Sequence, residues 1–136
     1  MGYKTYNLFI SHSWSYSDHY ERLKRLLDSS NQFSYRDYSV PKNDPIHNAR
    51  NEKDLEDAIR NQMKSASCVL ILAGVYSTFS KWIKIEIALA KELGKKIIAI
   101  EPYGALRTSY FVKSNADEVV SSYRSDSVIN AIKRLC

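Results

Sequence analysis

Short apolar runs and amphipathic stretches alternate along this chain. The apolar runs predict strands at residues 6–11, 33–37, 68–73 and 97–101 and a weaker strand at 118–120. In the stretches between them, apolar residues recur every three or four positions, which predicts helices at residues 18–29, 52–65, 80–93 and 125–135. Strands that alternate with helices form parallel sheets with right-handed crossovers.

The run at 68–73 is apolar at every position, which is typical of a parallel strand covered by helices on both faces. It is the predicted centre of the sheet. Residues 1–136 are expected to form a single α/β domain with three layers. Its sheet is predicted to be doubly wound, parallel and five-stranded, with the flavodoxin-like order 2-1-3-4-5. Gly94 is placed to end the preceding helix in the left-handed conformation.

Ligands in sheets of this type bind beyond the carboxyl ends of the strands. The segments expected there are residues 11–17, 37–50, 74–80 and 103–114. One long loop, residues 39–51, contains Pro41 and Pro45 and has few apolar residues to bury. We expect this loop to be mobile without ligand and to become ordered against the site when ligand binds, which hydrogen exchange would detect.

Composition and charge narrow the class of protein. The chain is 44% hydrophobic and 26% charged, as in globular domains, and no apolar run approaches the roughly 20 residues that cross a bilayer. It opens without an apolar leader, so we expect a cytoplasmic protein with no membrane partner. The net charge of +5 comes from scattered basic residues, which argues against nucleic acid as a partner.

The two cysteines are expected to be free thiols. Cys68 lies inside an apolar run, where a thiol acts as a small hydrophobic group, and Cys136 is the last residue. Stable disulfides are rare in the cytoplasm. The compartment therefore predicts no structural disulfide.

Several common kinds of site do not fit the residue types. With glycine only at positions 2, 74, 94 and 104, neither a dinucleotide fingerprint nor a phosphate loop can be written. A phosphoacceptor receiver needs acidic residues after the first strand, where this chain has Ser11 and His12. The histidines lack partners at ligand spacing, so no metal site is predicted.

Glu86 is the residue that a purely structural account explains least well. It lies in a mostly apolar helix, and its own face carries Trp82, Leu89 and Ala90. A buried carboxylate is costly unless it is paired, protonated or open to a ligand. It is therefore either a functional carboxylate or one half of a structural ion pair. Its early position in the helix directs it toward the carboxyl edge of the sheet.

Three sequence segments resemble the motifs of TIR domains, in the same order. The segment Tyr6 to His12, Tyr-Asn-Leu-Phe-Ile-Ser-His, resembles their opening box. Arg36-Asp37 resembles the start of their second box, and Ser80-Lys-Trp-Ile-Lys-Ile-Glu86 resembles their serine, tryptophan and later glutamate. Together with the Asp-Tyr-Ser-Val-Pro segment from Asp37, these motifs most resemble the ThsB-type TIR-like group of Thoeris antiphage systems. The resemblance covers nearly the whole chain.

This resemblance implies an activity and its residues. Many TIR domains cleave the bond between nicotinamide and ribose in NAD, and the glutamate that matches Glu86 is their catalytic residue. ThsB-type proteins make a cyclic ADP-ribose-like signal upon phage infection, which activates a separate effector. NAD would thus be a substrate, with no cofactor and no metal. A phage-derived trigger and a homo-oligomer are left open. The substrate-binding residues would be Phe9, Ser11, His12, Ser13, Tyr38, Ser39, Tyr76 and Trp82.

Two other functions fit the same residues. A non-catalytic TIR-like module would act through association with other TIR domains, and Glu86 would then be a buried structural acid. A nucleoside deoxyribosyltransferase-like enzyme would share the sheet and attack a ribosyl carbon with its carboxylate, but it would act on nucleosides. Fold resemblance alone does not choose among the three functions.

Overall fold

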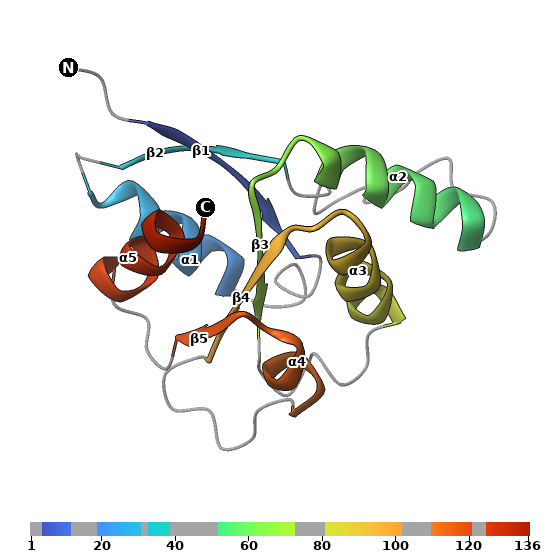
Figure 1. Ribbon diagram of the computed structural model, residues 1–136. Coiled ribbons are helices and arrows are strands. Elements are labelled where there is room, and N and C mark those ends of the chain that lie inside the picture. The colour runs from blue at the N-terminus through green and yellow to red at the C-terminus, as the bar shows by residue number, and fades with distance from the viewer. Residues whose placement is uncertain are drawn as a thin grey trace.

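The protein has a five-stranded parallel sheet between two layers of helices. The computed structural model describes residues 4–11, 19–30, 33–38, 52–72, 81–101, 110–120 and 125–136. All paired strands are parallel and their order is β2-β1-β3-β4-β5, which confirms the predicted topology (Figure 1). The strands are β1 (Thr5–Ile10), β2 (Ser34–Asp37), β3 (Cys68–Leu72), β4 (Lys96–Ile100) and β5 (Glu118–Val120).

Five helices cover the sheet in the described part of the chain. They are α1 (His19–Asp28), α2 (Glu52–Lys64), α3 (Lys81–Glu92), α4 (Tyr110–Asn115) and α5 (Ser125–Leu135). Helices α1 and α5 lie on one face, and α2, α3 and α4 lie on the other (Figure 1). The sequence missed α4, which overlaps the end of the expected loop 103–114, because a helix of six residues is too short to show periodicity. No described helix is long and apolar enough to span a membrane.

Alternate residues of the strands supply two separate cores. In β3, Cys68 and Leu70 face α1 and α5, whereas Val69 and Ile71 face the opposite layer. The other buried strands follow the same period of two. On the first face the helices contribute Leu23, Leu27, Val128, Ile129 and Ile132, and on the second Ile59, Met63, Ile83, Ile87 and Val112. A continuous apolar run is therefore required in β3, as the sequence predicted.

The end of α3 determines where β4 begins. Gly94 has a φ of +69°, the left-handed conformation that the sequence predicted for it. The Lys95 N–H donates to the Ala90 carbonyl over 2.8 Å, which closes the helix with a Schellman-type bond. Strand β4 begins at Lys96, two residues after Gly94.

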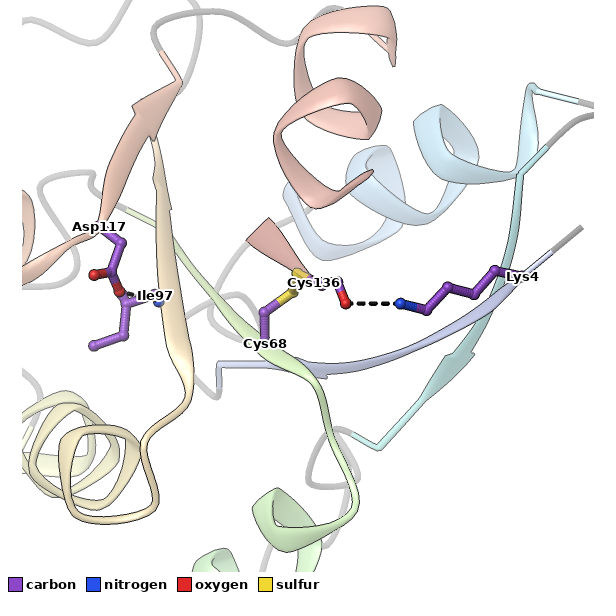
Figure 2. The surroundings of a disulfide bond; sticks show 5 residues. All are labelled: Lys4, Cys68, Ile97, Asp117 and Cys136. Atoms are coloured by element: carbon purple, nitrogen blue, oxygen red, sulfur yellow. Dashed lines mark hydrogen bonds between the residues drawn. A yellow bond between two sulfur atoms is a disulfide. The ribbon is translucent and has the colours of Figure 1, made fainter. Parts of the chain in front are cut away.

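A disulfide joins Cys68 to Cys136, so the expectation of two free thiols was wrong. Their Cα atoms are 5.8 Å apart, although 68 positions separate them in the sequence (Figure 2). Cys68 points toward the α5 face of the sheet, and the apolar stripe of α5 seats that helix on the same face. The end of α5 thus reaches the start of β3. An argument from compartment alone cannot detect this proximity.

Asp117 fastens the short edge strand β5 to β4. Its carboxylate accepts a hydrogen bond from the Ile97 N–H over 2.8 Å (Figure 2). Its own N–H donates to the Ile97 carbonyl, also over 2.8 Å. We expect Asp117→Ala to lower the free energy of unfolding by about 1–2 kcal/mol, because the Ile97 N–H loses its acceptor. Asp117→Asn keeps an acceptor oxygen and is the matched control. Urea unfolding of the three proteins tests this, and equal stabilities would contradict it.

Candidate functional site

Ser11 lies at the carboxyl end of β1, next to the central strand. Its N–H donates to the carbonyl of Leu70 in β3 over 2.9 Å, so it continues the pairing of the two strands. Side chains alternate along a strand, and Ser11 is two positions after Phe9, which belongs to the core beneath α3. The Ser11 side chain therefore faces the layer that contains α3. Only 2% of Ser11 is exposed.

Glu86 occupies the buried face of α3. It is 0% exposed, and the same helix buries Ile83, Ile87 and Ala90 within one turn of it. A carboxylate in such surroundings requires hydrogen-bond donors, because an ionised carboxylate left unpaired away from water is strongly unfavourable. The apolar sequence around Glu86 thus predicts its burial correctly, and the question becomes what it contacts.

The Ser11 hydroxyl donates a hydrogen bond to Glu86 Oε1 over 2.6 Å. That length lies within the ordinary range of O–H···O hydrogen bonds. The bond connects β1 with α3 across 75 positions of sequence, and both side chains are buried. It holds one oxygen of Glu86 beside the carboxyl end of β1. Sequence reasoning selected both residues but did not predict that they contact each other.

This contact lies where the strand order of the sheet reverses. From β1 the chain first goes to β2 on one side of the sheet, and it later returns to β3 on the other side of β1. In doubly wound sheets, ligands bind beyond the carboxyl ends of the strands at this switch point. Ser11 ends the strand at the switch, and Glu86 is its hydrogen-bonded neighbour. The pair therefore occupies the usual place of a ligand site in this fold.

Tyr38 is at the same edge of the sheet. Its N–H donates to the Leu8 carbonyl over 2.8 Å, so it directly extends β2 beside β1. The residue is half-buried. A neighbouring residue that the sequence did not select, Asp37, forms an ion pair with Lys24 of α1 over 3.3 Å. Partly exposed pairs of this kind contribute little stability, but this one fixes the end of β2 against α1.

The remaining predicted site residues are placed differently. Phe9 is 0% exposed and packs in the core formed with α2 and α3. Trp82 lies in α3, and its side chain is outside what the structure describes. His12, Ser13, Ser39 and Tyr76 lie outside the described residues, as does the loop 39–51. Ser11, Glu86 and Tyr38 are thus the predicted residues that the described structure brings to one edge of the sheet.

The described side chains of this site suit proton and charge chemistry. Within the described ranges, no three His, Cys, Asp or Glu residues gather where they could hold a metal ion. A carboxylate held by a hydroxyl can accept a hydrogen bond from a ligand hydroxyl or stabilise a nearby positive charge. Both capacities suit a reaction in which a sugar loses the group bound to its C1′ and becomes positively charged.

Comparisons with known proteins agree with the fold and select a family. Residues 9–107 match the family model described as "Thoeris protein ThsB, TIR-like domain". A comparison with curated proteins gives no match. Among the solved structures that are similar is the Clostridium botulinum CMP N-glycosidase BcmB, at 14% identity and a TM-score of 0.54. The similarity covers 94% of this chain and 98% of that one, and it shows a shared fold.

Proposed function

The chain belongs to the TIR-like domain family of the Thoeris protein ThsB, and from this premise we propose that it cleaves the nicotinamide–ribose bond of NAD. The observation that carries the proposal is the fully buried Glu86 carboxylate, hydrogen-bonded to Ser11 at the switch point of the sheet. In this proposal Glu86 is the catalytic residue, and NAD is a substrate rather than a cofactor.

The chemistry calls for a carboxylate beside a ribose. When the bond between C1′ and the nicotinamide nitrogen breaks, nicotinamide leaves with the bonding electrons and positive charge develops on C1′ and O4′ of the ribose. A carboxylate with little access to water stabilises that charge, or it holds the ribose hydroxyls in place. Attack by water then gives ADP-ribose, whereas attack by a nitrogen of the same molecule gives a cyclic product. The cyclic product is the proposed signal to a separate effector.

Besides Glu86, three of the described residues have defined roles in this proposal. Ser11 Oγ already donates to Glu86 Oε1, so it orients the carboxylate rather than binding substrate through the same hydrogen. Tyr38 extends the neighbouring strand at the same edge, which supports its proposed role of stacking on a ring of the ligand. Phe9 supports the site from the core beneath it.

One solved structure that shares this fold is a CMP N-glycosidase, and its name suggests a second candidate substrate class to test. That protein is named for cleaving an N-glycosidic bond in a nucleotide, and the same kind of bond joins nicotinamide to ribose. A pyrimidine nucleotide is therefore the alternative substrate. The two candidate substrates differ in the base that is released, and Glu86 would have the same role in either reaction.

Product analysis tests the proposed function. Pure protein is incubated separately with NAD and with CMP, and the products are separated by chromatography. The NAD reaction is repeated in lysate from phage-infected cells, because an infection-derived trigger is part of the proposal. Release of nicotinamide is the expected result, with ADP-ribose or its cyclic isomer as the second product. Release of cytosine alone would move the assignment to the nucleotide class, and no release in any arm would favour a non-catalytic interaction module.

A further inference from the structure

The Cys68–Cys136 disulfide connects two parts of the molecule that have very different exposure. Cys68 is the first residue of β3 and is 0% exposed, packed in the core under α1 and α5. Cys136 follows α5 and is partly exposed at the edge of that core. An incoming thiolate must contact the sulfur that it attacks, so we expect attack at the partly exposed Cys136 rather than at the buried Cys68.

Charged groups around Cys136 also favour exchange at that sulfur. The exposed Lys4 ammonium donates to the Cys136 carbonyl over 3.0 Å, so a cation lies beside this residue (Figure 2). Lys133 is exposed in the last turn of α5. Cations attract thiolates and stabilise a Cys136 thiolate once it is released. The negative end of the helix acts in the opposite direction.

Helix α5 has enough other contacts to stay folded when the disulfide opens. It buries Val128, Ile129 and Ile132 against the sheet. Arg134 makes two hydrogen bonds to the Glu118 carboxylate of β5, over 2.7 and 2.6 Å. Loss of the disulfide therefore frees Cys136, the residue after α5, from its covalent link to β3 and leaves the helix in place. Cys136 is then held only by weaker described contacts, the hydrogen bond from its N–H to the Ile132 carbonyl and the hydrogen bond from Lys4 to its own carbonyl.

We propose that Cys68–Cys136 is a thiol–disulfide exchange site, at which small thiols of the glutathione class or a protein dithiol react with Cys136 and release the end of α5. The attacking thiolate forms a mixed disulfide with Cys136, and the bond between the two cysteines breaks. Cys68 leaves as a thiolate and takes up a proton, because its apolar surroundings disfavour the charge. A second thiol then attacks the mixed disulfide and releases Cys136. The reductant is oxidised to its own disulfide as the protein gains two thiols.

The site lies away from Glu86, so it controls a different part of the molecule. Cys68 begins β3 on the α5 face, whereas Ser11 meets β3 near Leu70 and faces α3. Reduction is expected to alter the edge formed by the end of α5 and Lys4, which contacts Cys136. Neither of the readouts below involves nucleotide cleavage, so the test does not depend on the proposed function.

Reduction of the native protein tests the exchange site. The full chain is treated with dithiothreitol without denaturant, and free thiols are alkylated and located by peptide mass spectrometry. We expect reduction within minutes and alkylation of Cys136 roughly tenfold or more faster than that of Cys68, because Cys68 is buried. Hydrogen exchange on the same sample should accelerate about tenfold or more at the last turn of α5, with α3 unchanged. A disulfide that opens only in denaturant, or a reduction that unfolds the whole domain, would overturn the proposal.

Two single variants form a matched pair. Cys68→Ala leaves the partly exposed thiol, and Cys136→Ala leaves the buried one. With oxidised glutathione, we expect Cys68→Ala to form a mixed disulfide at Cys136 and Cys136→Ala to remain largely unmodified. Equal modification of the two variants, with both folded by circular dichroism, would show that burial does not select the reacting sulfur and would overturn the assignment of Cys136.

Discussion

Glu86→Gln abolishes nucleotide cleavage if the carboxylate stabilises the ribosyl charge, and we expect a loss on the order of 10³-fold or more in kcat. Glutamine has the shape of glutamate and still offers Oε1 to the Ser11 hydroxyl, so the hydrogen bond across β1 and α3 can persist. What disappears is the negative charge. We therefore expect the melting temperature to be unchanged or higher, because a buried charge has been removed.

The control for this variant lies on the same helix. Glu92 is also in α3, but its side chain is 55% exposed and pairs with Arg60 of α2. Its partner Arg60 has a raised pKa, mainly because of its hydrogen bond to Glu92. Glu92→Gln should leave cleavage unchanged. A folded Glu86→Gln protein with full activity would end the catalytic assignment. Stability that falls by about 3–5 kcal/mol with this variant would indicate a structural ion pair instead.

The sequence predicted the fold because its strong signals are local. An uninterrupted apolar run identified the central strand, and alternation with amphipathic helices indicated parallel pairing, both of which the structure confirms. Gly94 and the apolar stripe of α5 were also predicted correctly, since each depends on residues within a few positions. Helix α4 was missed because six residues do not establish a period.

The features that the sequence did not predict depend on residues far apart in the chain. Cys68 and Cys136 are 68 positions apart, and Ser11 and Glu86 are 75 apart. Each pair forms because a helix packs on the face of the sheet toward which the strand residue points, α5 over Cys68 and α3 over Ser11. The sequence indicated that Glu86 needs a partner, and the apolar helix around it was the physical signal. The register of β1 against β3 and the packing of α3 on the sheet determine that Ser11 contacts Glu86.

Ser11→Ala tests whether the hydroxyl orients the catalytic carboxylate. The change leaves Glu86 Oε1 without the donor that lies 2.6 Å away, in a place where 0% of Glu86 is exposed. We expect the free energy of unfolding to fall by about 1.5–3 kcal/mol, as for other hydrogen bonds to charged groups. Activity should fall roughly 10- to 100-fold, mainly in kcat, because a displaced carboxylate still allows substrate to bind but stabilises the transition state less well.

A conservative variant and a double variant separate this positioning role from a general loss of stability. Ser11→Thr keeps a hydroxyl and should recover most of the kcat, whereas Ser29→Ala, which removes an exposed hydroxyl bonded to the Leu26 carbonyl, should have no effect. The double variant of Ser11→Ala with Glu86→Gln should be no less active than Glu86→Gln alone, because without the charge the hydroxyl has no catalytic group to orient. If Ser11→Ala retains full kcat, Ser11 serves only the packing beneath α3. If the two losses multiply instead, Ser11 contributes to the reaction independently of Glu86, and the positioning role is wrong.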